Sequence, residues 1–393
     1  MTYPILLILG LLCAFAPMAI DLYLPSFPAL AGAFDVSVEQ VQTSLAAYFV
    51  GLAIGQLIYG PLADRFGRRR PLIVGTCIFA FASLLCAFSP SLHWLIAARF
   101  LQALGGCAGM VIYRAVIRDL CNTLESARVF SQLMLVMGVA PMLAPLLGGW
   151  LLVAFGWRAV FMVLFAFGLL ALLVIWRGLP ETSAPVRHSP RDMLRAYLSV
   201  FRDPALVGYG LAGGLGIAGM FAYIAGSPFV FIELYGVAPA NYGWLFGINA
   251  AGFILMAQLN ALLLHRHGPA YWLRRASWLY VVAAGGLLAM AIVGPEQLWP
   301  LFLPLFVAIT SQACILPNAT ACAMAGQGEK AGIASATLGF LQFGVAAASA
   351  SLVTLFHDGS ARPMAAVIFG CALASLLLTW MTASRVAPSD LEF

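Results

Sequence analysis

The chain of 393 residues has a single lysine and few charged residues of either sign. This lysine, Lys330, lies between Glu329 and Ala331, so the sequence has no Gly-Lys-Ser/Thr end of a phosphate-binding loop. Without such a loop the chain cannot hydrolyse ATP as a primary pump does. An ATP-driven transporter is therefore excluded for this chain.

Clusters suited to catalysis or metal binding are also lacking in the sequence. The five histidines fall in predicted loops or at the ends of apolar segments, and the eight cysteines show neither a disulfide framework nor metal-ligand spacing. A channel would need repeated subunits or a continuous polar lining, and the sequence indicates neither. We therefore expect no enzyme activity, no cofactor and no metal.

Long apolar runs are what the sequence has in abundance. Hydrophobic residues make up 63% of the chain and charged residues only 9%, whereas soluble domains have about 25% charged residues. Each run of about 20 residues is long enough to cross a hydrocarbon layer of about 30 Å as a helix, which satisfies its own backbone in lipid. We predict an all-α membrane protein with twelve transmembrane helices, at 4–28, 40–61, 71–88, 92–114, 129–150, 157–176, 205–227, 241–264, 272–293, 298–321, 332–356 and 362–383.

One long hydrophilic segment divides these helices into two sets of six. Such a division is typical of transporters in which two helical bundles rock about a shared site. The sequence predicts an N-terminal bundle at 1–176, a cytoplasmic linker with a short amphipathic helix at 177–204, and a C-terminal bundle at 205–393.

Basic residues predict the orientation in the membrane. If the N-terminus is cytoplasmic, 16 of the 20 lysines and arginines fall on the cytoplasmic side, and the opposite topology would invert this bias. Both termini are then cytoplasmic, in a multi-pass protein of the cell inner membrane. The net charge of +5 is explained by anchoring to anionic lipid headgroups, so no nucleic-acid partner is expected.

The acid that interrupts the first apolar run is the leading functional candidate. Asp21 follows Ile5–Ile20, and a carboxylate at membrane depth costs about 2.5–3.5 kcal/mol on insertion scales. At 1.5 Å per residue, Asp21 and Arg99 both lie roughly 10 Å below the outer surface, so we predict a proton-handling pair. A guanidinium favours the ionised acid and apolar surroundings favour the neutral acid, so separating the two would switch Asp21 between releasing and holding a proton. The alternative is a static ion pair that only aligns two helices.

The strongest motif lies between the second and third predicted helices, at Gly60–Pro71. Glycines there would let the helix ends and the loop pack closely, and Asp64 can bind an arginine or backbone donors. A simple positive-inside anchor is the alternative, although it would not need Gly60, Asp64 and Gly67 at this spacing. The residues predicted to form a gating latch are Gly60, Asp64, Arg65, Gly67, Arg68 and Arg69.

Three segments carry a family resemblance. Gly60–Pro71 resembles the loop signature of the major facilitator superfamily, Arg99–Gly106 resembles its proton-transfer motif, and Gly138–Gly149 resembles its antiporter motif, although Ala103 and Ala144 replace usual glycines. With Ala19–Pro25, the chain is similar to the bicyclomycin-resistance (Bcr/CflA) branch of drug:proton antiporters. The resemblance implies alternating access, with Asp21 carrying the proton and Arg99 tuning it. The antiporter-motif residues, implied to prevent leak, are Gly138, Pro141, Pro145, Gly148 and Gly149.

A drug-sized pocket should be apolar and aromatic with a few orienting polar groups. The resemblance implies substrates like bicyclomycin, chloramphenicol or sulfonamides, while an exporter or facilitator of a small metabolite, such as an amino acid or a sugar, is the rival interpretation. Small-residue pairs in the helices suit packing within one chain, so we expect a monomer. Candidate substrate contacts are Tyr23, Tyr48, Gln56, Gln102, Tyr223, Asn249, Asn318, Phe340 and Gln342.

Overall fold

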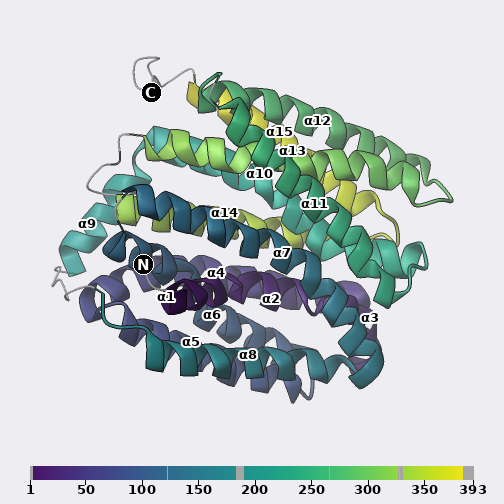
Figure 1. Cartoon of the computed structure of the whole chain (residues 1–393). Coiled ribbons are helices and arrows are strands. Elements are labelled where there is room, and N and C mark those ends of the chain that lie inside the picture. The colour runs from purple at the N-terminus through teal and green to yellow at the C-terminus, as the bar shows by residue number, and fades with distance from the viewer. Residues whose placement is uncertain are drawn as a thin grey trace. The chain divides into compact units, whose positions relative to one another are not determined.

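The structure, a computed structural model, describes residues 3–121, 123–182, 190–264, 266–325, 327 and 331–383. Every regular element among these residues is a helix, as Figure 1 shows. Eleven helical segments are long and apolar enough to cross a membrane, and the remaining predicted span, 129–150, lies within the helix Thr123–Phe155. The predicted all-helical membrane fold is confirmed.

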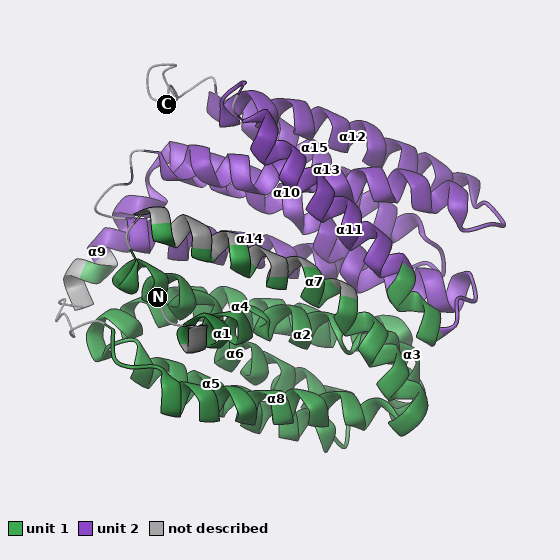
Figure 2. Ribbon diagram, in the orientation of Figure 1, with its two compact units in different colours: residues 1–193, 239–244 green, residues 194–238, 245–393 purple. Residues whose placement is uncertain are grey.

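The chain forms two compact units, coloured separately in Figure 2. Unit 1 comprises Met1–Met193 with Pro239–Trp244, and unit 2 comprises Leu194–Ala238 with Leu245–Phe393. The helices of unit 1 are α1 (Tyr3–Cys13), α2 (Phe15–Asp21), η1 (Leu24–Ser26), α3 (Phe27–Phe34), α4 (Val38–Phe66), α5 (Arg69–Ala87), α6 (Leu92–Leu120), α7 (Thr123–Phe155) and α8 (Trp157–Gly178). Those of unit 2 are α10 (Pro204–Pro228), η2 (Phe229–Leu234), α12 (Pro269–Val293), α13 (Trp299–Met324), α14 (Ala331–Leu355) and α15 (Arg362–Ala383), while α9 (Pro190–Phe201) and α11 (Pro239–Leu263) have residues in both.

Each unit is built around one central helix. In unit 1, α6 packs against α4 and α5, and α5 packs in turn against α8. Gly105 of α6 lies directly on the backbone of α5, where a Cβ would come within 2.9 Å of the Phe79 Cα. In unit 2, α10 packs against α13, α14 and α15. Close approach of backbones through small residues is how helices associate without a hydrophobic driving force in lipid.

The first predicted span is broken rather than continuous. It forms α1, α2, the 3-10 turn η1 and α3, and α2 ends at Asp21. Pro25 has no N–H, so it cannot donate the hydrogen bond that a continuous helix would give to the Asp21 carbonyl. The sequence therefore interrupts its own helix beside the buried acid.

Two other helices extend beyond the predicted bounds. Helix α4 continues to Phe66 and α6 to Leu120, so the polar residues Asp64 and Asp119 sit on helical turns rather than in loops. These extended ends place the two acids beside the short connection to α5.

Candidate functional site: a buried guanidinium and a carboxylate-bound loop

Arg99 of α6 lies in the interior of unit 1 with no exposed surface. Its Nη2 donates to the backbone carbonyl of Ala19 at 2.9 Å, and its Nη1 donates to the side-chain oxygen of Gln102. Gln102 in turn donates to Ser83 Oγ at 2.7 Å, which links α6 to α5. A buried charge needs such partners, because an uncompensated one is costly to desolvate.

Two tyrosine rings complete the surroundings of this guanidinium. The Arg99 Cζ lies 4.2 Å from the ring centroid of Tyr23 and 4.2 Å from that of Tyr48. A guanidinium within about 6 Å of an aromatic face is attracted to the ring, most strongly where water is excluded. We name the Tyr23 and Tyr48 rings, the Gln102 amide and the Ala19 carbonyl the Arg99 cage.

Asp21 lies in the same layer, two residues beyond Ala19, and is only 4% exposed. Its Oδ1 has no hydrogen-bond partner among the described residues. In the part of the chain that the structure describes, Asp21 and Arg99 form no ion pair, so the predicted pair is not formed in this arrangement. The two residues do lie in one layer, because Arg99 binds the Ala19 carbonyl two residues before Asp21. The guanidinium instead contacts the rings of the Arg99 cage and donates hydrogen bonds to its neutral oxygens. A carboxyl group buried without a cation is far cheaper to hold as the neutral acid.

The candidate substrate contacts fall into separate groups. In unit 1, Tyr23, Tyr48 and Gln102 contact Arg99, and Gln56 is buried. In unit 2, Asn249 donates to Tyr223 at 3.0 Å, and Asn318 donates to Asn260 at 2.8 Å. Phe340 packs on Phe201, and Gln342 is partly exposed on α14. A substrate role stays a prediction for all of them.

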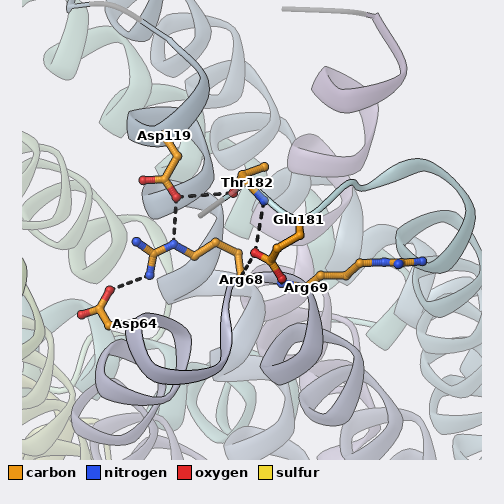
Figure 3. Close-up of polar contacts among 6 residues, drawn as sticks. All are labelled: Asp64, Arg68, Arg69, Asp119, Glu181 and Thr182. Carbon is orange, nitrogen blue, oxygen red and sulfur yellow. Dashed lines mark hydrogen bonds and ion pairs between the residues drawn. The ribbon is translucent and has the colours of Figure 1, made fainter. Parts of the chain in front are cut away.

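Arg68, in the connection between α4 and α5, binds two carboxylates (Figure 3). Its Nη1 lies 2.6 Å from Asp64 Oδ1, and its Nε lies 2.8 Å from Asp119 Oδ2. Burial lowers the pKa of this guanidinium, but the hydrogen bonds to Asp119 and Asp64 and the negative charges of these two acids together raise it by more, so the pKa lies above its ordinary value. Arg68, rather than Arg65, is therefore the partner of Asp64.

Glu181, just after α8, binds the backbone at the start of α5. Its two carboxylate oxygens accept from the N–H groups of Arg68 at 2.7 Å and Arg69 at 3.2 Å. The side chain of Arg69 donates back to the Trp176 carbonyl in the last turn of α8 at 2.5 Å. A carboxylate at a helix N-terminus satisfies orphan donors and complements the helix dipole, so Glu181 caps α5 from a distant part of the chain.

Gly67 is required by this cap, whereas Gly60 is not explained by packing. Gly67 has a φ of +82°, and a Cβ there would collide with the Glu181 carboxylate. A Cβ on Gly60 would meet no atom within 4 Å among the described residues. The predicted close packing therefore holds for Gly67 only.

Gly67→Ala is expected to destabilise unit 1 for two reasons: the backbone conformation is unfavourable for alanine, and the added Cβ would collide with the Glu181 carboxylate. The backbone of Gly67, with φ +82° and ψ 174°, is essentially restricted to glycine and costs an alanine roughly 1–3 kcal/mol, and the collision with Glu181 adds to this cost. In a Glu181→Ala background the same change should cost less, by on the order of 1 kcal/mol, because only the backbone penalty remains. Chemical unfolding of the four proteins in mixed micelles measures this. Equal costs in both backgrounds would show that Glu181 does not restrict this position.

Three partners in this network were not predicted from the sequence: the acids Asp119 and Glu181, and the threonine Thr182. Thr182 Oγ1 lies 3.3 Å from the Asp119 carboxylate, which joins both acids into one network. The available signal was the position of Asp119 and Glu181, since each lies at or just after the end of an apolar helix, on the side where the arginines collect. Which acid binds which arginine depends on tertiary packing.

The predicted antiporter motif lies in α7. Gly148 is pressed against α2, since a Cβ there would collide with the carbonyl of Leu22, the residue after Asp21. Gly149 lies against Pro239, whose carbonyl oxygen would be 2.7 Å from a Cβ. Pro141 and Pro145 lie within the helix, and the surroundings of Gly138 lie outside the described residues. The motif therefore brings α7 onto the broken helix that carries the buried acid.

Gly148→Ala is expected to destabilise the protein by about 1–3 kcal/mol, because the added methyl overpacks the contact with Leu22. Gly370→Ala in α15 is the matched control, since a Cβ there meets no described atom within 4 Å. Thermal unfolding in detergent compares the two variants. A Gly148→Ala protein as stable as the Gly370→Ala protein would contradict the close contact between α7 and α2.

Eleven helical segments of the described chain, long and apolar enough to cross a membrane, define a polytopic membrane protein, in which a broken span carries a buried acid and an arginine loop binds carboxylates. The sequence matches the Major Facilitator Superfamily over residues 9–351. The chain belongs to this superfamily of membrane transporters.

Related proteins align with essentially the whole chain. It is 38% identical to the uncharacterized MFS-type transporter YdgK of Bacillus subtilis, over 98% of this chain and 96% of that protein. It is 31% identical to a bicyclomycin resistance protein homolog of Haemophilus influenzae, over 98% and 97%. A crystal structure of the D-xylose-proton symporter shares the fold, with a TM-score of 0.71 at 15% identity over 99% of both chains. The predicted resemblance to the bicyclomycin-resistance branch is confirmed.

Proposed function

We propose that this transporter exports hydrophobic or amphipathic antibiotics in exchange for protons, by alternating access. The observation that carries the proposal is the Asp21 carboxyl group, buried at a helix break without a cation, in the same layer as the buried Arg99. An acid at membrane depth is retained for a role, and proton relay is the role such groups commonly have. Bicyclomycin-, chloramphenicol- and sulfonamide-like compounds are the proposed substrates.

The remaining parts of the proposal concern placement and assembly. Two six-helix bundles, 1–176 and 205–393, would move about the substrate, with 177–204 as the cytoplasmic linker. Both termini would be cytoplasmic in the cell inner membrane, and the working unit would be a monomer. The bundles would bind the small-molecule substrate and protons without any cofactor.

In this proposal the loop at Arg68 latches one side of the transporter. Asp64, Arg68 and Asp119 hold the ends of α4 and α6 together, and Glu181 holds the start of α5. Release of these contacts would accompany opening. The α7 motif, pressed on α2 beside Asp21, would keep protons from leaking past the acid.

Everted membrane vesicles energised by respiration test the proposal. Their lumen is acidified, so a drug carried inward by the antiporter should drive protons out and raise the luminal pH. A panel of bicyclomycin-, chloramphenicol- and sulfonamide-like drugs is added to vesicles with and without the protein. Drug uptake that neither moves protons nor responds to an uncoupler would indicate a facilitator and would overturn the proposal.

A further inference from the structure

The Arg99 cage leaves a donor and an acceptor unused in one buried layer. Arg99 Nε has no hydrogen-bond partner among the described residues, and neither has Asp21 Oδ1. Both atoms are shielded from solvent, where leaving a polar group without a hydrogen-bond partner is unfavourable. A buried donor and a buried acceptor without partners need an explanation. One explanation is a second arrangement of the site in which the guanidinium and the carboxylate bind each other.

The Arg99 cage is what keeps the guanidinium from that second arrangement. Its other donors are taken by the Ala19 carbonyl and the Gln102 amide, and the Tyr23 and Tyr48 rings lie at 4.2 Å from its Cζ. All of these partners are uncharged. They compensate the positive charge only partly, so a carboxylate that appeared nearby would compete for it effectively.

We propose that Tyr23 and Tyr48 are positioning residues of the proton site, whose rings compete with the Asp21 carboxylate for the Arg99 guanidinium. With Asp21 neutral, Arg99 stays in the cage, as in this structure. When Asp21 releases its proton, the guanidinium turns from the rings to the carboxylate. This inference rests on the proposed function, in which Asp21 exchanges its proton during transport.

The proposal removes both tyrosines from the expected substrate contacts. Each is fully buried, and each ring contacts the guanidinium. The Tyr23 hydroxyl is 3.3 Å from Ser44 Oγ, whereas the Tyr48 hydroxyl has no hydrogen-bond partner among the described residues. Tyr48 therefore contributes its ring rather than its hydroxyl, which provides a matched pair of substitutions.

Among the residues that the structure describes, few other ionisable groups face this layer. Cys86 of α5 and Cys107 of α6 lie close enough to interact electrostatically with Arg99 or the tyrosines. Such thiols and phenols ordinarily titrate at about 8.5 and 10, and are neutral near pH 7. Helix α7 has no ionisable side chain between Arg128 and its end, and Arg158 at the start of α8 packs on Trp157. Asp21 and Arg99 are therefore the charges that decide the titration.

The test follows the infrared band of the protonated Asp21 carboxyl group in the purified full-length protein. The band is identified by subtracting the spectrum of Asp21→Asn, and the pH at which half of it is lost is measured. In Tyr48→Leu, Arg99 is freed for the carboxylate, so this pH should fall by about one unit, a tenfold change in proton affinity. In Tyr48→Phe the ring is kept, and the midpoint should stay that of the unmodified protein.

Tyr23→Leu and Tyr23→Phe form a second pair, used if Tyr48→Leu does not fold. An unchanged midpoint in a folded leucine variant, an upward shift, or equal shifts in the leucine and phenylalanine variants would overturn the role of the rings. The vesicle assay answers separately for the proposed function. If drugs move no protons while the leucine variants still shift the midpoint, the antiport proposal fails and the competition for Arg99 stands.

Discussion

Asp21→Asn is expected to abolish drug-dependent proton release from everted vesicles, with at least a tenfold loss relative to the unmodified protein. Asparagine matches aspartate in size and resembles the neutral acid, so the buried end of α2 should pack as before. It cannot take up or release a proton. Drug binding to the purified variant should therefore persist, while the coupled proton movement disappears.

The matched control is Asp35→Asn, fourteen positions further along the chain. Asp35 is exposed and ends α3 in the left-handed conformation, with a φ of +53°, which asparagine adopts readily. This variant removes one acid outside the buried layer and should release protons normally. Release that persists in a correctly inserted Asp21→Asn protein would remove Asp21 from the coupling role.

Arg68→Ala is expected to destabilise the protein by about 2 kcal/mol, below the roughly 3–5 kcal/mol of fully buried pairs. The expected loss of stability is smaller than for a fully buried pair because solvent screens the acids: the Asp64 side chain is 46% exposed and the Asp119 side chain 14% exposed. Removal of the guanidinium leaves both carboxylates without the cation that they share. Unfolding in mixed micelles measures the loss, and transport should fall as well.

Arg70→Ala separates the latch from a simple topological anchor. Arg70 lies two positions further along, is exposed, and carries the same charge. An anchor made only of positive charge would respond equally to both substitutions. We expect Arg70→Ala to keep its stability and transport, so equal losses in the two variants would contradict the latch.

The sequence predicted what depends on local pattern and depth. Apolar run length indicated the helices, and the rise per residue placed Asp21 and Arg99 in one layer. It did not predict that Arg99 would bind Tyr23, Tyr48 and the Ala19 carbonyl, because that choice depends on how side chains from three helices pack. The break after Asp21 follows from Pro25, yet apolar composition alone indicated one continuous helix.

Dependence on tertiary packing also explains why the acidic partners of the arginine loop were not predicted. Gly60–Pro71 predicted an arginine-rich connection with an acid, and the structure has both. The carboxylates that complete it come from Asp119 and Glu181, which lie 51 and 113 positions from Arg68. No local spacing links such distant residues. Gly67 was predicted to allow close packing, but the group that packs there, the Glu181 carboxylate in the space of a Cβ, appeared only in three dimensions.

Glu181 has a mechanical consequence for the helices that it joins. The Glu181 carboxylate, just after α8, accepts hydrogen bonds from the first turn of α5, and the Arg69 side chain of α5 donates to the Trp176 carbonyl of α8. These two packed helices are therefore bound to each other at one end in both directions. The short connection between α4 and α5 then cannot swing by itself. Any displacement of this connection therefore requires α8 to move with it.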